Sequence, residues 1–212
     1  MSRYSVDDHY LDPASGVLKN LLGITDAATL EETEAALAAT RAYELSLTPL
    51  QGAFDLAHLQ AVHRYLFRDV YEWAGQLRTI DISKGGSPFC HYAFIESAAT
   101  EVFRKLAAEK HLAGLAPAAL SERVAHYLGE LNALHPFREG NGRAQREFAG
   151  HLARANGYYI AWDNVKPADM LLASVDSFKG DIAKLTALIR GSLRTLDRDA
   201  AAPPRYRPGT AR

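Results

Sequence analysis

Residues 135–146 read HPFREGNGRAQR, and they constrain the fold more than any other segment, because they combine a helix stop with a helix start. Pro136 disfavours the α conformation of the residue before it, so the apolar-periodic helix that runs up to Leu134 should end near His135. Gly140 and Gly142 come just before a second long helical pattern, residues 143–155. The sequence therefore predicts two helices joined by a tight loop, with His135 at the exit of the first.

The same loop has the features of an anion-binding site. The first turn of a helix leaves backbone amides without intrahelical partners, and such a terminus attracts anions. Arg143 and Arg146 lie one helical turn apart beside those amides. Two fixed cations next to an amide nest suit a polyphosphate. Glu139 would repel phosphate, and a magnesium ion between the carboxylate and the phosphate oxygens resolves that conflict.

Each of these residues is weak evidence alone. A single histidine at a helix end is usually structural or solvated, and a Gly-Asn-Gly triplet is a common turn. The close spacing of base, acid, glycines and arginines is what favours a catalytic site. Phe137, an apolar residue in the loop, is expected to anchor that loop in the core. His58 and His63, five residues apart in an amphipathic helix, are interpreted as ordinary helix residues.

Helical patterns dominate the rest of the chain, so we expect a mostly α fold, a bundle of about seven or eight helices. The segment Thr29-Leu30-Glu31-Glu32 has capping-box spacing and should open a helix that runs to about Leu45. Asp55 should cap the next helix. Asn156-Gly157 should end the helix that follows the loop. The helix from Pro117 to Leu134 should bury a stripe of leucines together with Val124. Further helices are expected at about residues 97–110, 167–177 and 181–196.

One segment breaks the helical pattern. Residues 77–82 alternate in polarity, residues 89–95 are aromatic and extended, and a glycine-rich break separates them. This predicts the only β-hairpin of the chain, a flap over about residues 77–95. A lone hairpin leaves unpaired amides and carbonyls at its edges. The flap could therefore pack on the helices as a lid, or an extended segment of a target protein could add to its edge as a further strand.

Composition excludes several broad classes of function. The chain has 24 Lys and Arg against 25 Asp and Glu, so no global field favours nucleic acid or an anionic membrane. Cys90 is the only cysteine, so an internal disulfide is excluded and a reducing cytoplasm is the default location. The polar N-terminus lacks a signal-peptide core, and no apolar run approaches membrane-spanning length. We expect one domain over residues 1–196 and a disordered tail over 197–212.

The loop segment resembles the Fic family, because it fits the pattern His-Pro-Phe-x-Asp/Glu-Gly-Asn-Gly-Arg-x-x-Arg at every defined position. Residues 10–24, 70–75 and 129–134 also look like Fic domains, so the similarity covers about residues 8–195. It implies the Fic fold, a helical bundle with a flap beside the active site that docks a target protein. The implied docking residues are Ile82, Ser83, Lys84, Gly85, Gly86 and Phe89.

The resemblance implies AMP transfer from ATP to a Ser, Thr or Tyr hydroxyl of a target protein. His135 would be the general base, and Glu139 would hold Mg²⁺. The Asn141 side chain and the loop amides would stabilise charge on the transferred group, with Arg143 near the β-phosphate and Arg146 near the γ-phosphate. The implied phosphate-binding residues are Gly140, Asn141, Gly142, Arg143 and Arg146.

Fic proteins are regulated by an inhibitory helix with the pattern Ser/Thr-x-x-x-Glu-Gly/Asn, whose glutamate pairs with the second motif arginine. Residues 40–44 and 97–101 have the spacing, but Leu45 and Val102 follow, so neither completes the pattern. The resemblance thus implies a class I toxin held silent by a separate small antitoxin protein whose glutamate meets Arg146. Relatives of this type modify type II topoisomerases, which makes a DNA gyrase or topoisomerase IV subunit the first target candidate.

Two alternatives stay open. One is a related transferase with another donor, such as UTP or CDP-choline; kinase-like members carry lysine at the second motif glycine, whereas Gly142 is retained here. The other is a non-enzymatic helical module that only binds nucleotide, although such a module has no need for His135. The mass added to a target and the release of pyrophosphate distinguish these alternatives.

Overall fold

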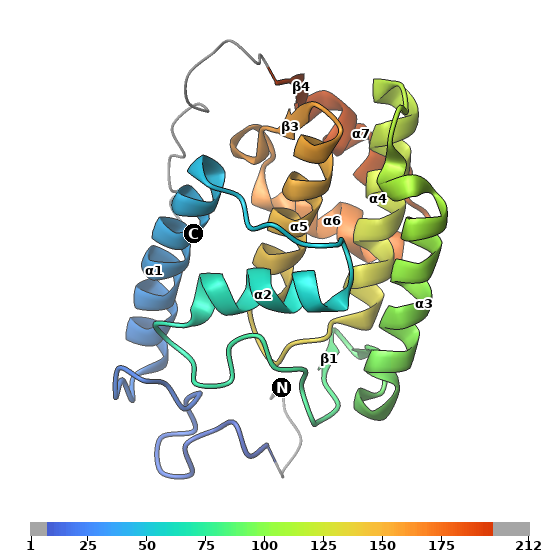
Figure 1. The fold of residues 1–212 in the computed structure, drawn as a ribbon. Coiled ribbons are helices and arrows are strands. Elements are labelled where there is room, and N and C mark those ends of the chain that lie inside the picture. The colour runs from blue at the N-terminus through green and yellow to red at the C-terminus, as the bar shows by residue number, and fades with distance from the viewer. Residues whose placement is uncertain (1–7, 197–212) are drawn as a thin grey trace.

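A computed structural model describes residues 8–196 of the chain (Figure 1). The predicted mostly α fold is confirmed, and the expected disordered tail, residues 197–212, lies outside the described residues. The described residues contain seven α-helices: α1 (Ala27–Leu47), α2 (Leu56–Phe67), α3 (Ile95–Ala108), α4 (Pro117–Leu134), α5 (Asn141–Ala155), α6 (Pro167–Phe178) and α7 (Ala183–Ser192).

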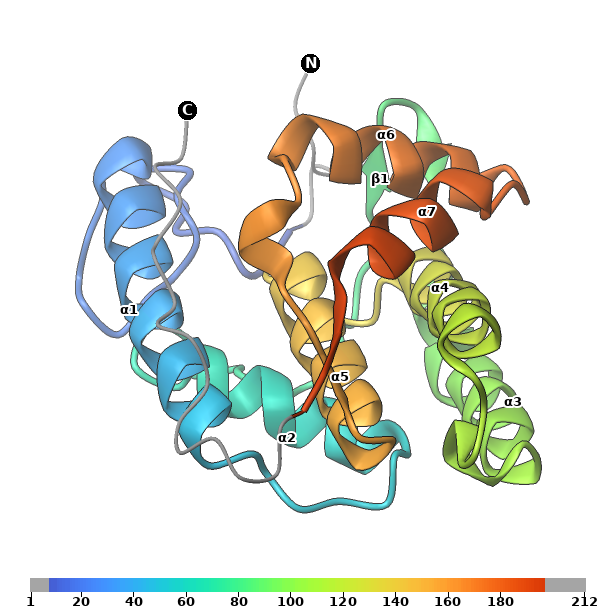
Figure 2. The ribbon, with the colours of Figure 1, turned by 90° about the horizontal axis from the view of Figure 1, so that it is seen from above.

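Helix α5 lies in the middle of the bundle, as Figure 2 shows from above. Helices α2 and α4 pack against it, α1 lies outside α2, and α3, α6 and α7 pack on α4. The predicted apolar stripe of α4 is buried and belongs to one hydrophobic cluster shared by these helices. Its members are Leu120, Val124, Leu128, Leu131 and Leu134. The loop that joins α4 to α5 is therefore supported by packed helices on both sides.

The helix starts follow their capping residues. Asp55 caps α2 as predicted, accepting a hydrogen bond from the amide of His58 at 2.8 Å. The prediction for α1 was wrong, because Asp26 and not Thr29 is the cap: its carboxylate accepts from the Thr29 amide at 2.8 Å, and the helix begins three residues earlier than a cap at Thr29 allows. Asn156 ends α5 as predicted.

The hairpin is shorter than predicted. Strands β1 (Ser83–Lys84) and β2 (Ser87–Pro88) have two residues each and pair antiparallel around a glycine turn with positive φ at Gly85 and Gly86. Residues 92–94, predicted as strand, form a 3₁₀ turn that leads into α3, because the His91 side chain caps it by accepting from the Ala93 amide. The flap is therefore a short projection with long non-strand arms.

The sequence did not predict a second strand pair, which is not a hairpin because α6 and α7 lie between its two strands. Strand β3 (Tyr158–Ile160) pairs antiparallel with β4 (Leu193–Thr195). The last predicted helix accordingly ends at Ser192, because the following residues exchange backbone hydrogen bonds with the segment after α5, including Leu196 N to Gly157 O at 2.9 Å. Across residues 8–196, the helices fall short of the length and apolarity that a membrane crossing requires.

Candidate active site

His135 ends α4 in the left-handed conformation, with φ 45° and ψ 60°. Few residues other than glycine adopt this region, so the surrounding contacts must hold it. Its amide donates to Leu131 O at 3.0 Å, and its Nδ1 lies 3.1 Å from Asn132 O. A carbonyl oxygen can only accept, so we assign the imidazole proton to Nδ1 and the free lone pair to Nε2. The backbone thereby selects the tautomer that leaves Nε2 basic.

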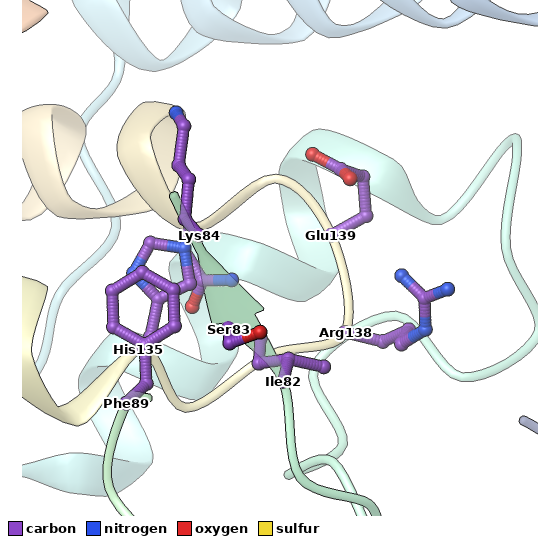
Figure 3. Close-up of a pocket in the computed structure, with 8 residues that line it drawn as sticks. Ile82, Ser83, Lys84, Phe89, His135, Arg138 and Glu139 are labelled. Atoms are coloured by element: carbon purple, nitrogen blue, oxygen red, sulfur yellow. The ribbon is translucent and has the colours of Figure 1, made fainter. Parts of the chain in front are cut away.

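The imidazole of His135 is neutral at neutral pH. Burial lowers its pKa to about 4, and the bond to Asn132 and the charge of Glu139 oppose that shift only in part. The flap contributes to the cover, because the ring of Phe89 stacks on the imidazole with 3.8 Å between ring centroids and 12° between ring planes (Figure 3). A neutral imidazole is the protonation state that a general base needs.

One pocket brings together predicted residues from two segments that are far apart in the sequence (Figure 3). Its lining residues are Ile82, Ser83, Lys84 and Phe89 from the flap, and His135, Arg138, Glu139 and Asn141 from the loop. Gly85 and Gly86 lie exposed at the flap tip and do not line it. Arg138, to which the sequence assigned no role, forms a buried ion pair with Asp8.

The Asn141 side chain is hydrogen-bonded within the loop. It is buried, and it accepts from Phe137 N at 2.9 Å while its amide donates to Phe137 O at 2.7 Å. Both ends of the side chain are thus bound to the loop itself, while Asn141 also lines the first pocket, and its role toward the transferred phosphate stays a prediction. Phe137 is fully buried and stacks on His63, with ring centroids 3.8 Å apart. The loop is folded tightly onto the core.

Gly140 is the cap of α5, and both its backbone conformation and its surroundings favour glycine. Its φ is +77°, and a Cβ there would lie 2.4 Å from the Phe67 ring. Its amide donates to Glu139 Oε1 at 3.1 Å, so in this structure the carboxylate occupies an amide predicted to bind phosphate. The amides that follow, at Asn141 and Gly142, belong to the first turn of α5, where amides have no intrahelical partner.

The two motif arginines have different surroundings. Arg143 forms an ion pair with Glu34, a buried carboxylate on α1, and its guanidinium lies 4.7 Å from the centre of the Phe67 ring. Glu34 also accepts a hydrogen bond from the Tyr71 hydroxyl. Arg146 lines a second pocket, whose other residues are Leu128, Asn132, Gly142, Gln145, Met170, Ser174, Ser177 and Leu185. The site thus extends from the first pocket along α5 to the second.

The interpretation of His63 as an ordinary helix residue was wrong. Its side chain is fully buried; Nδ1 accepts from Gly75 N at 2.9 Å, so Nε2 carries the proton and donates to Glu139 O at 3.0 Å. Burial lowers its pKa to about 3, which keeps it neutral. His58 is buried too and contacts His151. The helical spacing could have predicted the burial of His63, since it shares a helix face with Leu59, Val62 and Leu66, which are buried.

Acid should destabilise this protein well above the range in which carboxylates titrate. Burial lowers the pKa of His58, His63, His126 and His135 below the ordinary value of 6.5. Between pH 6.5 and about 4 the unfolded chain binds more protons than the folded one, so the free energy of unfolding is greatest above pH 6.5 and decreases as pH falls.

Urea unfolding at pH 7.5, 5.5 and 4.5 measures this dependence. We expect the midpoint to decrease at each step with an unchanged urea dependence. A midpoint that stays constant down to pH 4.5 would contradict the burial argument.

The fold and the site together define a class of protein. This helical domain places a neutral imidazole at the exit of one helix, beside the N-terminus of the next helix and two arginines. These are the groups that a phosphate-transfer site needs. The model of the Fic/DOC family matches residues 53–153. The probable protein adenylyltransferase Fic of Salmonella typhimurium is 40% identical over 186 residues, which cover 88% of this chain and 92% of that protein. The chain belongs to the Fic family.

Two further proteins, one compared by sequence and one by structure, are similar to this chain. It is 51% identical over 187 residues to protein adenylyltransferase VbhT of Bartonella schoenbuchensis, which covers 88% of this chain and 39% of that protein. The chain therefore spans about two fifths of that relative's length. The crystal structure of BepC from Bartonella tribocorum with bound AMPPNP superposes with a TM-score of 0.84 at 26% identity, over 88% of this chain and 96% of BepC.

Proposed function

We propose that this protein is a protein adenylyltransferase, which transfers AMP from ATP to a hydroxyl side chain of a target protein. One observation carries the proposal: the tautomer of His135 leaves Nε2 unprotonated in the pocket that also contains Glu139 and the start of α5. The relatives at 51% and 40% identity are named as protein adenylyltransferases, and BepC binds an ATP analogue.

In the proposed reaction, Nε2 of His135 takes the proton of the incoming hydroxyl. The hydroxyl oxygen forms a bond to the α-phosphorus of ATP, the bond from that phosphorus to the bridging oxygen breaks, and pyrophosphate leaves. Amides of the first turn of α5 stabilise the charge that develops on the transferred group. Arg143, held by Glu34, neutralises the β-phosphate, and Arg146 binds the γ-phosphate from the second pocket.

The residues present fit a magnesium ion that arrives with ATP. Residues 8–196 contain no group of three or more His, Cys, Asp or Glu side chains arranged to hold a metal. Glu139 is a single carboxylate in the pocket, and Mg²⁺ in nucleotide sites takes one or two carboxylates together with phosphate oxygens. Glu139 would hold the ion, which neutralises phosphate charge when bound.

Replacing Glu139 by glutamine should raise the magnesium concentration needed for half-maximal AMP transfer by about tenfold or more, because a neutral amide is a weaker ligand than a carboxylate. The glutamine retains an oxygen that can accept from the Gly140 amide. Initial rates measured against Mg²⁺ at saturating ATP test this. The exposed Glu101→Gln, whose carboxylate binds Arg104 on α3, serves as control. An unchanged magnesium dependence would remove Glu139 from the metal site.

We further propose that the flap docks the target as an added strand. Its two strands are short and exposed, and Phe89 stacks on His135, so a peptide along this edge passes close to the imidazole. Ile82, Ser83 and Lys84 line the same pocket and would contact the peptide next to the modified residue.

The proposed role is that of a toxin in the cytoplasm, silenced by an antitoxin that carries a Ser/Thr-x-x-x-Glu-Gly/Asn helix. Its support is that the sequence contains no complete inhibitory pattern of its own. The second pocket contains Arg146 and is where the antitoxin glutamate would bind. Expression of the chain alone should arrest bacterial growth, and a gyrase or topoisomerase IV subunit should gain 329 Da, the mass of an added AMP. Normal growth without any partner would contradict the toxin role.

Incubation with α-labelled ATP, magnesium and a bacterial lysate tests the proposed transferase activity. Label on a lysate protein or on the chain itself, absent with His135→Ala, supports AMP transfer. Labelled UTP and CDP-choline run in parallel distinguish the other donors. ATP binding without any label transfer or pyrophosphate release would overturn the proposal in favour of a binding module.

A further inference from the structure

Arg78 lies between α2 and the flap, and the mechanism above does not use it. Its side chain is fully buried. Nε donates to His135 O at 2.8 Å, Nη1 donates to Ile80 O at 2.6 Å, and Nη2 donates to Leu134 O at 3.3 Å and to Cys90 O. One guanidinium therefore binds the end of α4 and both arms of the flap at once.

Backbone bonds reinforce the same junction. The amide of Arg78 donates to Pro136 O at 2.9 Å, and the amide of Cys90 donates to Ala133 O at 3.1 Å. The carbonyls at the C-terminus of a helix have no intrahelical partners. Here those of Ala133, Leu134 and His135 are all bound by the flap arms or by Arg78. The left-handed turn at His135 is thus held by this junction.

The charge of Arg78 is stabilised chiefly by carbonyl oxygens. Within residues 8–196 its ion-pair partner is Asp81, whose Oδ1 lies 3.7 Å from Nη1 and whose side chain is half exposed. Burial lowers the pKa of Arg78, while the C-terminal end of α4 favours a cation. A lysine keeps the charge but has no planar fork that could reach four carbonyls in different directions. The geometry therefore depends on the guanidinium and on more than its charge.

We propose that Arg78 is a positioning residue that keeps the flap and His135 in register, so that a target strand on the flap presents its hydroxyl to Nε2. This inference rests on the proposed function for its catalytic consequence. The structural part of the inference is independent of that function. Without the guanidinium, the flap arms should separate from the end of α4, and Phe89 should leave the imidazole.

Arg78→Lys is the test variant, and Arg41→Lys is the matched control, because Arg41 binds Asp69 and Glu44 away from the pocket. We expect Arg78→Lys to lower kcat about 10- to 100-fold with the KM for ATP nearly unchanged. Hydrogen exchange at the Cys90 amide should accelerate.

The pKa of His135, followed by NMR, should rise from about 4 toward 6.5 in Arg78→Lys. The other groups that act on this imidazole, Asn132 O, Glu139 and Lys84, are retained in the variant, and so is a positive charge at position 78. Departure of the flap, which removes the Phe89 ring and moves Lys84 away from the imidazole, is then what raises the pKa. Arg41→Lys should change none of these measurements.

Unchanged Cys90 exchange and an unchanged His135 pKa would overturn the inference, whether or not AMP transfer is observed. The wild type could transfer no AMP while Arg78→Lys, unlike Arg41→Lys, shows faster Cys90 exchange and a higher His135 pKa. In that case the positioning role stands and the proposed function fails. A higher KM for ATP at constant kcat would also overturn the inference. Should Arg78→Lys fail to fold, Arg78→Gln replaces it, and unfolding of both variants would overturn the inference by showing that Arg78 holds the whole fold.

Discussion

Replacing His135 by alanine should lower the rate of AMP transfer by about 10²- to 10⁴-fold, the usual loss when a positioned general base is removed. The imidazole is neutral, its Nδ1 proton is held by Asn132 O, and the methyl group of alanine offers no replacement for Nε2. ATP binding should persist, because the amides of α5 and both arginines are untouched. The loss should therefore appear in kcat and not in the KM for ATP.

Initial rates with α-labelled ATP, together with nucleotide affinity by calorimetry, measure the two effects separately. His126→Ala is the control, since this histidine lies on the same helix but lines neither pocket. It should retain wild-type rates. A His135→Ala protein that binds ATP and still transfers AMP within tenfold of the wild-type rate would refute the base assignment.

Replacing Gly140 by alanine should destabilise the fold by about 2–5 kcal/mol, the sum of a left-handed residue with a Cβ and of overpacking against a buried ring. Its φ is +77°, and the added Cβ would lie 2.4 Å from the ring of Phe67, which is itself fully buried. Neither the ring nor the loop can shift freely, because the loop is bound to Asn141 and His63. AMP transfer should be lost as well.

Urea unfolding of Gly140→Ala against Gly150→Ala tests this expectation. Gly150 lies in the interior of the same helix, and a Cβ there would meet nothing within 4 Å. Gly150→Ala should therefore stabilise the protein by about 0.5–1 kcal/mol through the higher helix propensity of alanine. Equal unfolding midpoints for the two variants would show that the loop can rearrange around a side chain at position 140.

Local patterns predicted the helices well because each helix buries one face. The apolar stripe of α4, the cap at Asp55 and the end of α5 at Asn156 follow from residues a few positions apart. The flap strands were predicted too long, because alternation in residues 77–82 was attributed to strand pairing. Arg78 was part of that alternation, and its burial results from contacts with α4 and not from a sheet.

The motif residues of the site were found from the sequence, but their partners were not. Arg143 and Glu34 are 109 residues apart, His63 and Glu139 are 76 apart, and Arg78 and His135 are 57 apart. Spacing along a helix or loop carries no information about such contacts. The hydrogen bonds of the Asn141 side chain to Phe137 were not predicted for the same reason, since they depend on how the loop closes.

The ion pair between Glu34 and Arg143 sets a lower limit on the length of a working enzyme. The segment that matches the family model begins at residue 53, after α1 has ended, yet the carboxylate that holds Arg143 comes from α1. A fragment trimmed to the shared family segment would keep every motif residue and still lose this partner of the arginine that we propose binds the β-phosphate. The proposed catalytic unit therefore includes α1.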